Sequence, residues 1–88
     1  MTLGPSLSRA LRDIAAGGDY TGIGYRPTFR GRHRAIPWRI MAGLEDRSLV
    51  RVLWHERMRG TGEPVWRAEI TENGRAVLAA HAKAEGAV

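Results

Sequence analysis

The amino-acid sequence predicts a small α+β fold with three helices and a two-stranded antiparallel β-hairpin. Apolar residues recur at helical spacing over residues 6–16 and again after Pro37. The apolar period then changes to two over residues 50–70, on both sides of a glycine-containing turn, and a final alanine-rich helix follows. The 88 residues are enough for one apolar core without disulfides or metal. We assign residues 1–84 to a single domain and residues 85–88 to a frayed C-terminal tail.

The first helix is expected to begin with Ser6 as its cap and to run to about Ala16. Leu7, Leu11 and Ile14 form its apolar stripe, and the glycine pair that follows ends it. Residues 19–36 contain three glycines and a proline, which argue against a long helix. We expect irregular backbone in this segment, with its arginines facing water.

The second helix is expected to start with Pro37 as its first residue and to end near Arg47 or Ser48. Its apolar face comprises Ile40, Met41 and Leu44. Thr71 is expected to cap the last helix.

The hairpin between these helices is indicated by alternation of apolar and polar residues. One strand carries Val50, Val52 and Trp54 on its apolar face, and the other carries Trp66, Ala68 and Ile70. Residues 59–62 form the turn, and Pro64 stands at the start of the second strand, where a missing N–H is tolerated. We expect Trp54 and Trp66 to lie on the buried face.

Two segments in this region resemble a known family. MAGLEDRSLVRVLW is similar to the end of the recognition helix and the first wing strand of winged helix-turn-helix domains, and AEITENGRAVLAA is similar to their second wing strand and following helix. The resemblance covers residues 37–80 and implies a winged-helix-like domain that binds DNA. Ser48 stands where the family usually has glycine, and residues 20–30 occupy the place of the helix that braces the recognition helix against the DNA backbone.

The charge of the chain points to a polyanionic partner. The net charge is +5, and Lys83 is the only lysine among fourteen cationic residues. Between Tyr25 and Trp38 there are four arginines and His33 but no acid. Such a run is typical of an electrostatic footprint for nucleic acid, although a solvated loop is the competing interpretation. A GC-rich genome could explain the preference for arginine over lysine, but not the clustering.

The first functional hypothesis is a small nucleic-acid-binding regulator of transcription. Its helix from Pro37 would present Trp38, Arg39 and either Met41 or Glu45 near a DNA groove, with Trp38 expected to pack rather than to stack on a base. The arginine cluster would hold phosphates, which confer affinity but no sequence information. The residues expected to bind nucleic acid or another partner are Arg26, Arg30, Arg32, Arg34, Arg39, Arg57 and Arg59.

The second hypothesis is a non-enzymatic protein-binding module on the same scaffold. Small free-standing domains of mobile elements, such as phage-type inhibitors, can block a host nucleic-acid-handling complex without catalysis. The arginines, with Tyr20, Tyr25 and Phe29 nearby, would then dock on an acidic protein surface, since arginine and tyrosine are enriched in interface hot spots. The strand edges also offer a homodimer contact by edge pairing.

An enzymatic function is not expected. His33, His55 and His81 are scattered without metal-binding spacing, and His55 and Glu56 should point to opposite faces of a strand. The chain has no cysteine, so it can form neither a disulfide nor a cysteine-based zinc site. We therefore predict no catalytic residue, metal or cofactor. No apolar run is long enough to span a bilayer and no signal peptide is recognisable, so a cytoplasmic location without membrane contact is expected.

Overall fold

The computed structural model describes residues 3–17 and 19–86, with the side chains described as far as Lys83. Over these residues the chain forms three helices and three strands, which confirms the α+β class. In chain order the elements are α1 (Pro5–Ala15), β1 (Tyr20–Ile23), α2 (Trp38–Asp46), β2 (Val50–Arg57), β3 (Pro64–Ile70) and α3 (Glu72–Gly86).

The sheet contains a third strand, so the prediction of a two-stranded hairpin alone was wrong. The strand order is β1-β3-β2 and both pairings are antiparallel. Tyr20 lies opposite Ala68 and Ile23 lies opposite Val65. Because β1 is only four residues long and includes Gly22, its own sequence carries little strand signal. Its pairing along the whole strand comes from β3, which is far away in sequence.

The segment between β1 and α2, in which every residue is described, contains no helix. It is also more regular than expected, because one antiparallel bridge joins it to β1 and a second bridge lies within the segment itself. Thr21 pairs with Arg30, and Phe29 pairs with Ile36. The segment thus forms no helix at the place where the winged-helix resemblance implies a brace helix.

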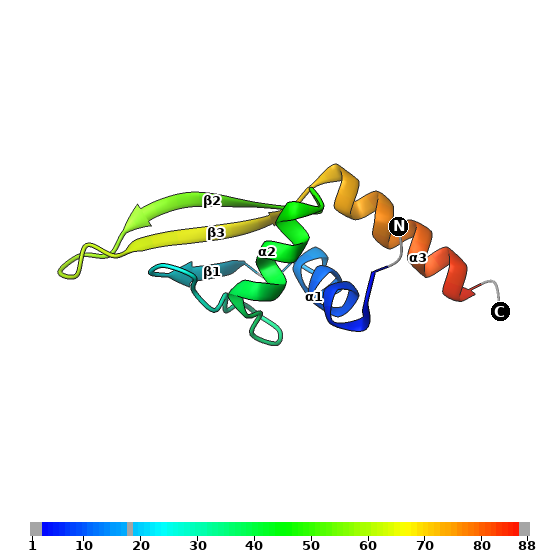
Figure 1. The fold of residues 1–88 in the computed structure, drawn as a ribbon, viewed down its shortest axis with the longest axis horizontal. Coiled ribbons are helices and arrows are strands. Elements are labelled where there is room, and N and C mark those ends of the chain that lie inside the picture. The colour runs from blue at the N-terminus through cyan, green and yellow to red at the C-terminus, as the bar shows by residue number, and fades with distance from the viewer. Residues whose placement is uncertain (1–2, 18, 87–88) are drawn as a thin grey trace.

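One face of the sheet carries the core, against which α1 and α2 pack (Figure 1). The largest fully buried side chains are those of Tyr20, Phe29, Leu11, Met41, Leu44 and Leu49. The molecule is elongated, with extents of 53 × 22 × 19 Å. Figure 1 shows that the β2–β3 hairpin and α3 reach out at opposite ends.

The helix boundaries confirm some of the predicted caps and correct others. Gly4, not Ser6, is the N-cap of α1, since Pro5 already occupies the first helical position. Pro37 is likewise the N-cap of α2 rather than its first residue, and α2 ends at Asp46. The cap on α3 is confirmed, because the Thr71 hydroxyl accepts the Gly74 N–H at 3.0 Å. The same hydroxyl donates to the Ser48 carbonyl oxygen at 2.6 Å.

The turn between α2 and β2 contains the residue that departs from the winged-helix pattern. Ser48 has a φ of 59°, in the left-handed region that favours glycine. The position thus has the backbone conformation for which glycine would be the usual choice.

The two tryptophans of the hairpin share a face as predicted, but only one is covered. Trp54 and Trp66 are cross-strand partners. Trp66 packs against the core and is half-buried, whereas 57% of Trp54 is exposed. The prediction that Trp54 is buried was therefore wrong, because the hairpin extends past the helices that cover the rest of this face (Figure 1).

Helix α3 continues to Gly86, so residues 85 and 86 of the predicted frayed tail are helical. The remaining two residues of that tail lie outside the described residues. Within the part of the chain that the structure describes, no helix combines the length and the apolar character that crossing a bilayer requires.

Candidate functional site

The arginines of the middle segment are displayed on a loop with a closed base. We call residues 30–35 the Arg loop. Phe29 and Ile36, which flank it, exchange two backbone hydrogen bonds of 2.8 Å each. Both of these side chains are buried in the core, so the base of the loop is fixed. The exposed residues of the loop include Arg30, Arg32, His33 and Arg34.

The Arg loop rests on a buried tyrosine. The side chain of Tyr20 is fully buried, and its hydroxyl donates a hydrogen bond of 2.9 Å to the carbonyl oxygen of Arg34. Gly31 crosses the face of the same ring so closely that a Cβ there would lie 2.9 Å from the ring carbons. Desolvation by burial, with a further contribution from the negative charge of Asp13, raises the pKa of Tyr20 above 10.0. Tyr20 therefore ties the backbone of the Arg loop to the core at Gly31 and Arg34.

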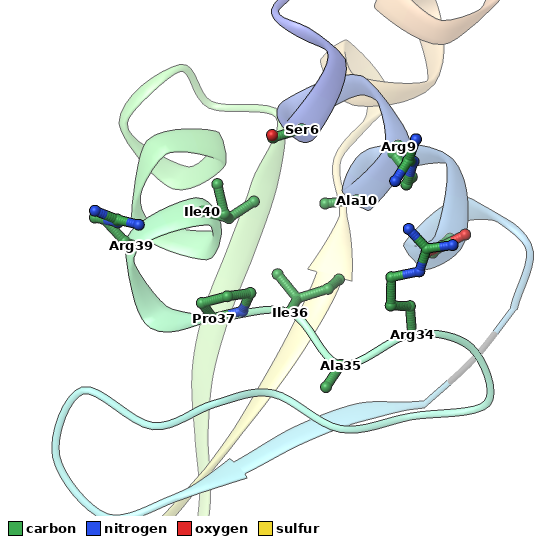
Figure 2. Close-up of a pocket in the computed structure, with 10 residues that line it drawn as sticks. Ser6, Arg9, Ala10, Arg34, Ala35, Ile36, Pro37, Arg39 and Ile40 are labelled. Atoms are coloured by element: carbon green, nitrogen blue, oxygen red, sulfur yellow. The ribbon is translucent and has the colours of Figure 1, made fainter.

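A groove of about 380 Å³ runs between α1 and the start of α2, and it collects arginines from three parts of the chain. Figure 2 shows Arg9 and Arg34 together on the side of α1, and Arg39 on the side of α2. The apolar part of its lining includes Ala10, Ile36, Pro37 and Ile40. One acid, Asp13, is among the residues that line it. The groove is thus cationic over an apolar floor.

The surroundings of the groove add to its positive potential. A neighbouring depression is lined by Arg9, Arg12, Asp13, His33 and Arg34, so the cationic surface continues toward the tip of the Arg loop. Helix α2 has no side-chain cap and no acid in its first turn. The positive end of its dipole therefore opens next to Arg39 without a neutralising carboxylate.

The arginines that the sequence predicted as one binding set are divided by the structure. All seven are exposed. Arg34 and Arg39 line opposite sides of the groove (Figure 2), and Arg30 and Arg32 lie on the adjoining Arg loop. Arg26 follows β1 on the other side of α2, where it lines a different cleft. Arg57 and Arg59 lie at the far end of the hairpin (Figure 1), where Arg57 donates to the carbonyl oxygen of Gly62 at 3.0 Å.

Sequence reasoning missed Arg9 as a member of the groove. In α1 taken alone, Arg9 lies on the exposed face of an ordinary amphipathic helix, opposite the apolar stripe of Leu7, Leu11 and Ile14. The available signal was the pair of cations on that face, Arg9 and Arg12, but the sequence does not show which loop the face meets. The expectation that Met41 could be presented to a partner was wrong, because its side chain is fully buried. Trp38 packs against the core as expected.

The histidines do not form a common site in the described structure. His33 lies on the Arg loop and His55 lies in the hairpin. The prediction that His55 and Glu56 point to opposite faces was wrong, since their side chains approach to 3.9 Å at the β-bulge between Trp54 and Glu56. Both are exposed, so the pair contributes little to stability. Among the described residues, no three histidines, aspartates or glutamates are grouped to hold a metal ion.

No model of a protein family, no curated protein and no solved structure matches this chain.

Proposed function

We propose that this protein is a small nucleic-acid-binding regulator with a winged-helix-like fold, which holds the phosphate backbone of duplex DNA with the Arg loop and the adjoining groove. The observation that carries the proposal is that Arg9, Arg34 and Arg39, from three parts of the chain, line one groove, with Arg9 and Arg34 on one side of it and Arg39 on the other (Figure 2). Arginine forms bidentate hydrogen bonds with phosphate oxygens. The buried Tyr20 holds the backbone of the Arg loop at Arg34, which supports the placement of that arginine beside the groove.

The winged-helix part of the proposal is supported by local features rather than by overall likeness. The β2–β3 hairpin follows α2 directly, and α3 follows the hairpin. Ser48 adopts the left-handed conformation at the position where the family usually has glycine. Because the segment between β1 and α2 forms no brace helix, we assign the backbone-holding role to the Arg loop.

The surface of α2 supports binding that depends little on DNA sequence. Arg39 is an exposed residue of α2 with donors suited to a base edge, while Glu45 and Asp46 near its C-terminus are acidic. Phosphate contacts position a protein without reading sequence. We therefore propose affinity for duplex DNA in general, with sequence preference limited to contacts made by Arg39.

The test is the salt dependence of binding to a random-sequence duplex, followed by fluorescence anisotropy between about 50 and 200 mM salt. The double variant Arg32→Ala/Arg34→Ala should bind more weakly, and its slope of log K against log salt should be shallower by about 1.8, at about 0.9 for each lost phosphate contact. The matched control, Arg51→Ala/Arg75→Ala, removes the same charge from β2 and α3 and should leave the slope unchanged. Equal slopes for the two double variants would contradict the proposal.

A second candidate function is a protein-binding or inhibitory module on the same scaffold. It is favoured by large apolar side chains on the projecting hairpin, where Leu53 is 38%, Trp54 57% and Met58 39% exposed. Tryptophan is frequent among residues that dominate binding energy at interfaces. If the protein bound no duplex DNA at low salt, recovery of one specific protein partner that is lost with Trp54→Ala would support this candidate instead.

A further inference from the structure

A second hollow, distinct from the groove of the Arg loop, lies between α2 and the sheet. We call it the aromatic cleft. It has a volume of about 450 Å³ and is lined by Tyr25, Arg26, Pro27, Trp38, Glu45, Val52 and Trp66. Three aromatic side chains from three parts of the chain thus share one cleft that the proposed phosphate contacts do not use.

The walls of the aromatic cleft are held by specific contacts. The indole N–H of Trp66 donates to the carbonyl oxygen of Gly24 at 2.9 Å, which fixes the orientation of this ring. Tyr25, which follows Gly24 in the chain, is 84% exposed. An exposed patch of apolar surface this large on a single side chain is unusual. Arg26 follows with a φ of 50°, a conformation that is uncommon for a residue with a side chain. The turn therefore places an exposed ring and a guanidinium at the rim of the cleft.

The cleft also contains a carboxylate, that of Glu45, whose orientation is fixed by a hydrogen bond. Glu45 accepts the backbone N–H of Val52 through Oε2 at 3.1 Å, which ties the side chain of α2 to the edge of β2. Its other oxygen is not needed for that hydrogen bond. A carboxylate oxygen in this position accepts hydrogen bonds and offers none, so it favours a ligand that carries N–H groups.

We propose that the aromatic cleft binds one unstacked base of single-stranded DNA, and that it prefers a base with an exocyclic amino group. This inference rests on the proposed nucleic-acid function and adds a ligand class to it. Aromatic side chains provide stacking surfaces for bases, Arg26 faces the phosphate that accompanies the base, and Glu45 accepts from the amino group, as carboxylates do from cytosine. The net charge of +5 and the arginine at the rim oppose a cationic ligand, which an aromatic cleft could otherwise hold.

The test compares oligo(dC) with oligo(dT) as probes, measured by anisotropy and by quenching of tryptophan fluorescence at one salt concentration. Wild-type protein should bind oligo(dC) more tightly than oligo(dT), because thymine lacks an exocyclic amine. Tyr25→Ala should weaken binding of oligo(dC) by about fivefold or more. Trp54→Ala, which removes an exposed ring outside the cleft, should leave binding unchanged.

A second variant separates recognition of the amine from stacking. Glu45→Gln keeps an acceptor for the Val52 N–H but replaces the free carboxylate oxygen with an amide donor. It should abolish the preference for oligo(dC) over oligo(dT), measured as the ratio of the two affinities, because the lost negative charge affects both oligonucleotides alike. Retention of the full preference in Glu45→Gln would overturn the role of this carboxylate.

The outcomes distinguish an error in the proposed role of the aromatic cleft from an error in the proposed function of the protein. Duplex binding that depends on the Arg loop, with no effect of Tyr25→Ala on oligo(dC), would overturn the cleft and leave the function standing. Equal losses for Tyr25→Ala and Trp54→Ala would show general stacking on exposed rings, and would also overturn it. A partner protein whose binding is lost with Tyr25→Ala, in a chain that binds no oligonucleotide, would assign the cleft to that protein and contradict both proposals.

Discussion

Removal of the Tyr20 hydroxyl tests whether its hydrogen bond holds the Arg loop in place. Tyr20→Phe keeps the buried ring and removes only the donor of the 2.9 Å hydrogen bond to the carbonyl oxygen of Arg34. A neutral hydrogen bond of this kind contributes about 1 kcal/mol to the free energy of unfolding. In a domain of this size that corresponds to a lower Tm by about 4–8 °C. Tyr25→Phe is the matched control, because the ring of Tyr25 is 84% exposed.

The effect of Tyr20 on stability should also depend on pH. Its pKa is raised above 10.0 in the folded state, first by desolvation and then by Asp13. Above pH 10.0 the unfolded chain loses the phenolic proton while the folded chain keeps it, so the free energy of unfolding falls as pH rises. The stability contribution is fully present below that pH and is lost as pH rises through the folded pKa. The advantage of wild type over Tyr20→Phe should therefore shrink in alkaline solution.

Urea unfolding followed by tryptophan fluorescence, at neutral and at alkaline pH, measures both effects. Duplex binding by the same variant provides the functional reading. Affinity should fall because the loop loses an anchor, while the salt slope stays unchanged because no charge is removed. Wild-type stability together with wild-type duplex affinity in Tyr20→Phe would refute the view that this hydroxyl positions the Arg loop.

Four further substitutions probe the loop, the hairpin and the last helix. Gly31→Ala would place a Cβ 2.9 Å from the tyrosine ring, so it should displace the Arg loop and weaken duplex binding in an anisotropy titration; unchanged affinity would contradict this. Trp66→Ala should lower the free energy of unfolding by about 3 kcal/mol, and Trp54→Ala by about 0.5 kcal/mol, in urea titrations; equal losses would contradict the assigned burial. Gly74→Ala would drive a Cβ into the carbonyl oxygen of Leu49, so thermal unfolding should show a loss of about 1–3 kcal/mol, which an unchanged Tm would exclude.

The elements with strong local signals could be predicted from the sequence. The change of apolar period from helix to strand located the β2–β3 hairpin, and Thr71 acts as a cap because its hydroxyl is placed to accept the Gly74 N–H. The α+β class and the exposure of the arginines followed from such local patterns. These features depend on residues close together in the chain, which is why pattern and propensity suffice.

The features that depend on distant partners could not be predicted. Strand β1 exists because Tyr20 and Gly22 align with Ala68 and Trp66, more than forty residues away in the chain. The alternation of the hairpin identified the face of Trp54 but not how far the helices extend over it. Arg9 joins the site only because α1 packs beside the Arg loop, which the helix sequence does not reveal. In each case the missing information is tertiary packing.

The central claim is that the Arg loop and the start of α2 form the surface that contacts duplex DNA. Titration of the isotope-labelled protein with a random-sequence duplex, followed by backbone amide chemical shifts, tests it most directly. Shift changes should concentrate in residues 30–35, around Arg9 in α1 and around Arg39 in α2. Changes confined to the hairpin around Arg57 and Arg59, or no changes at low salt, would contradict it.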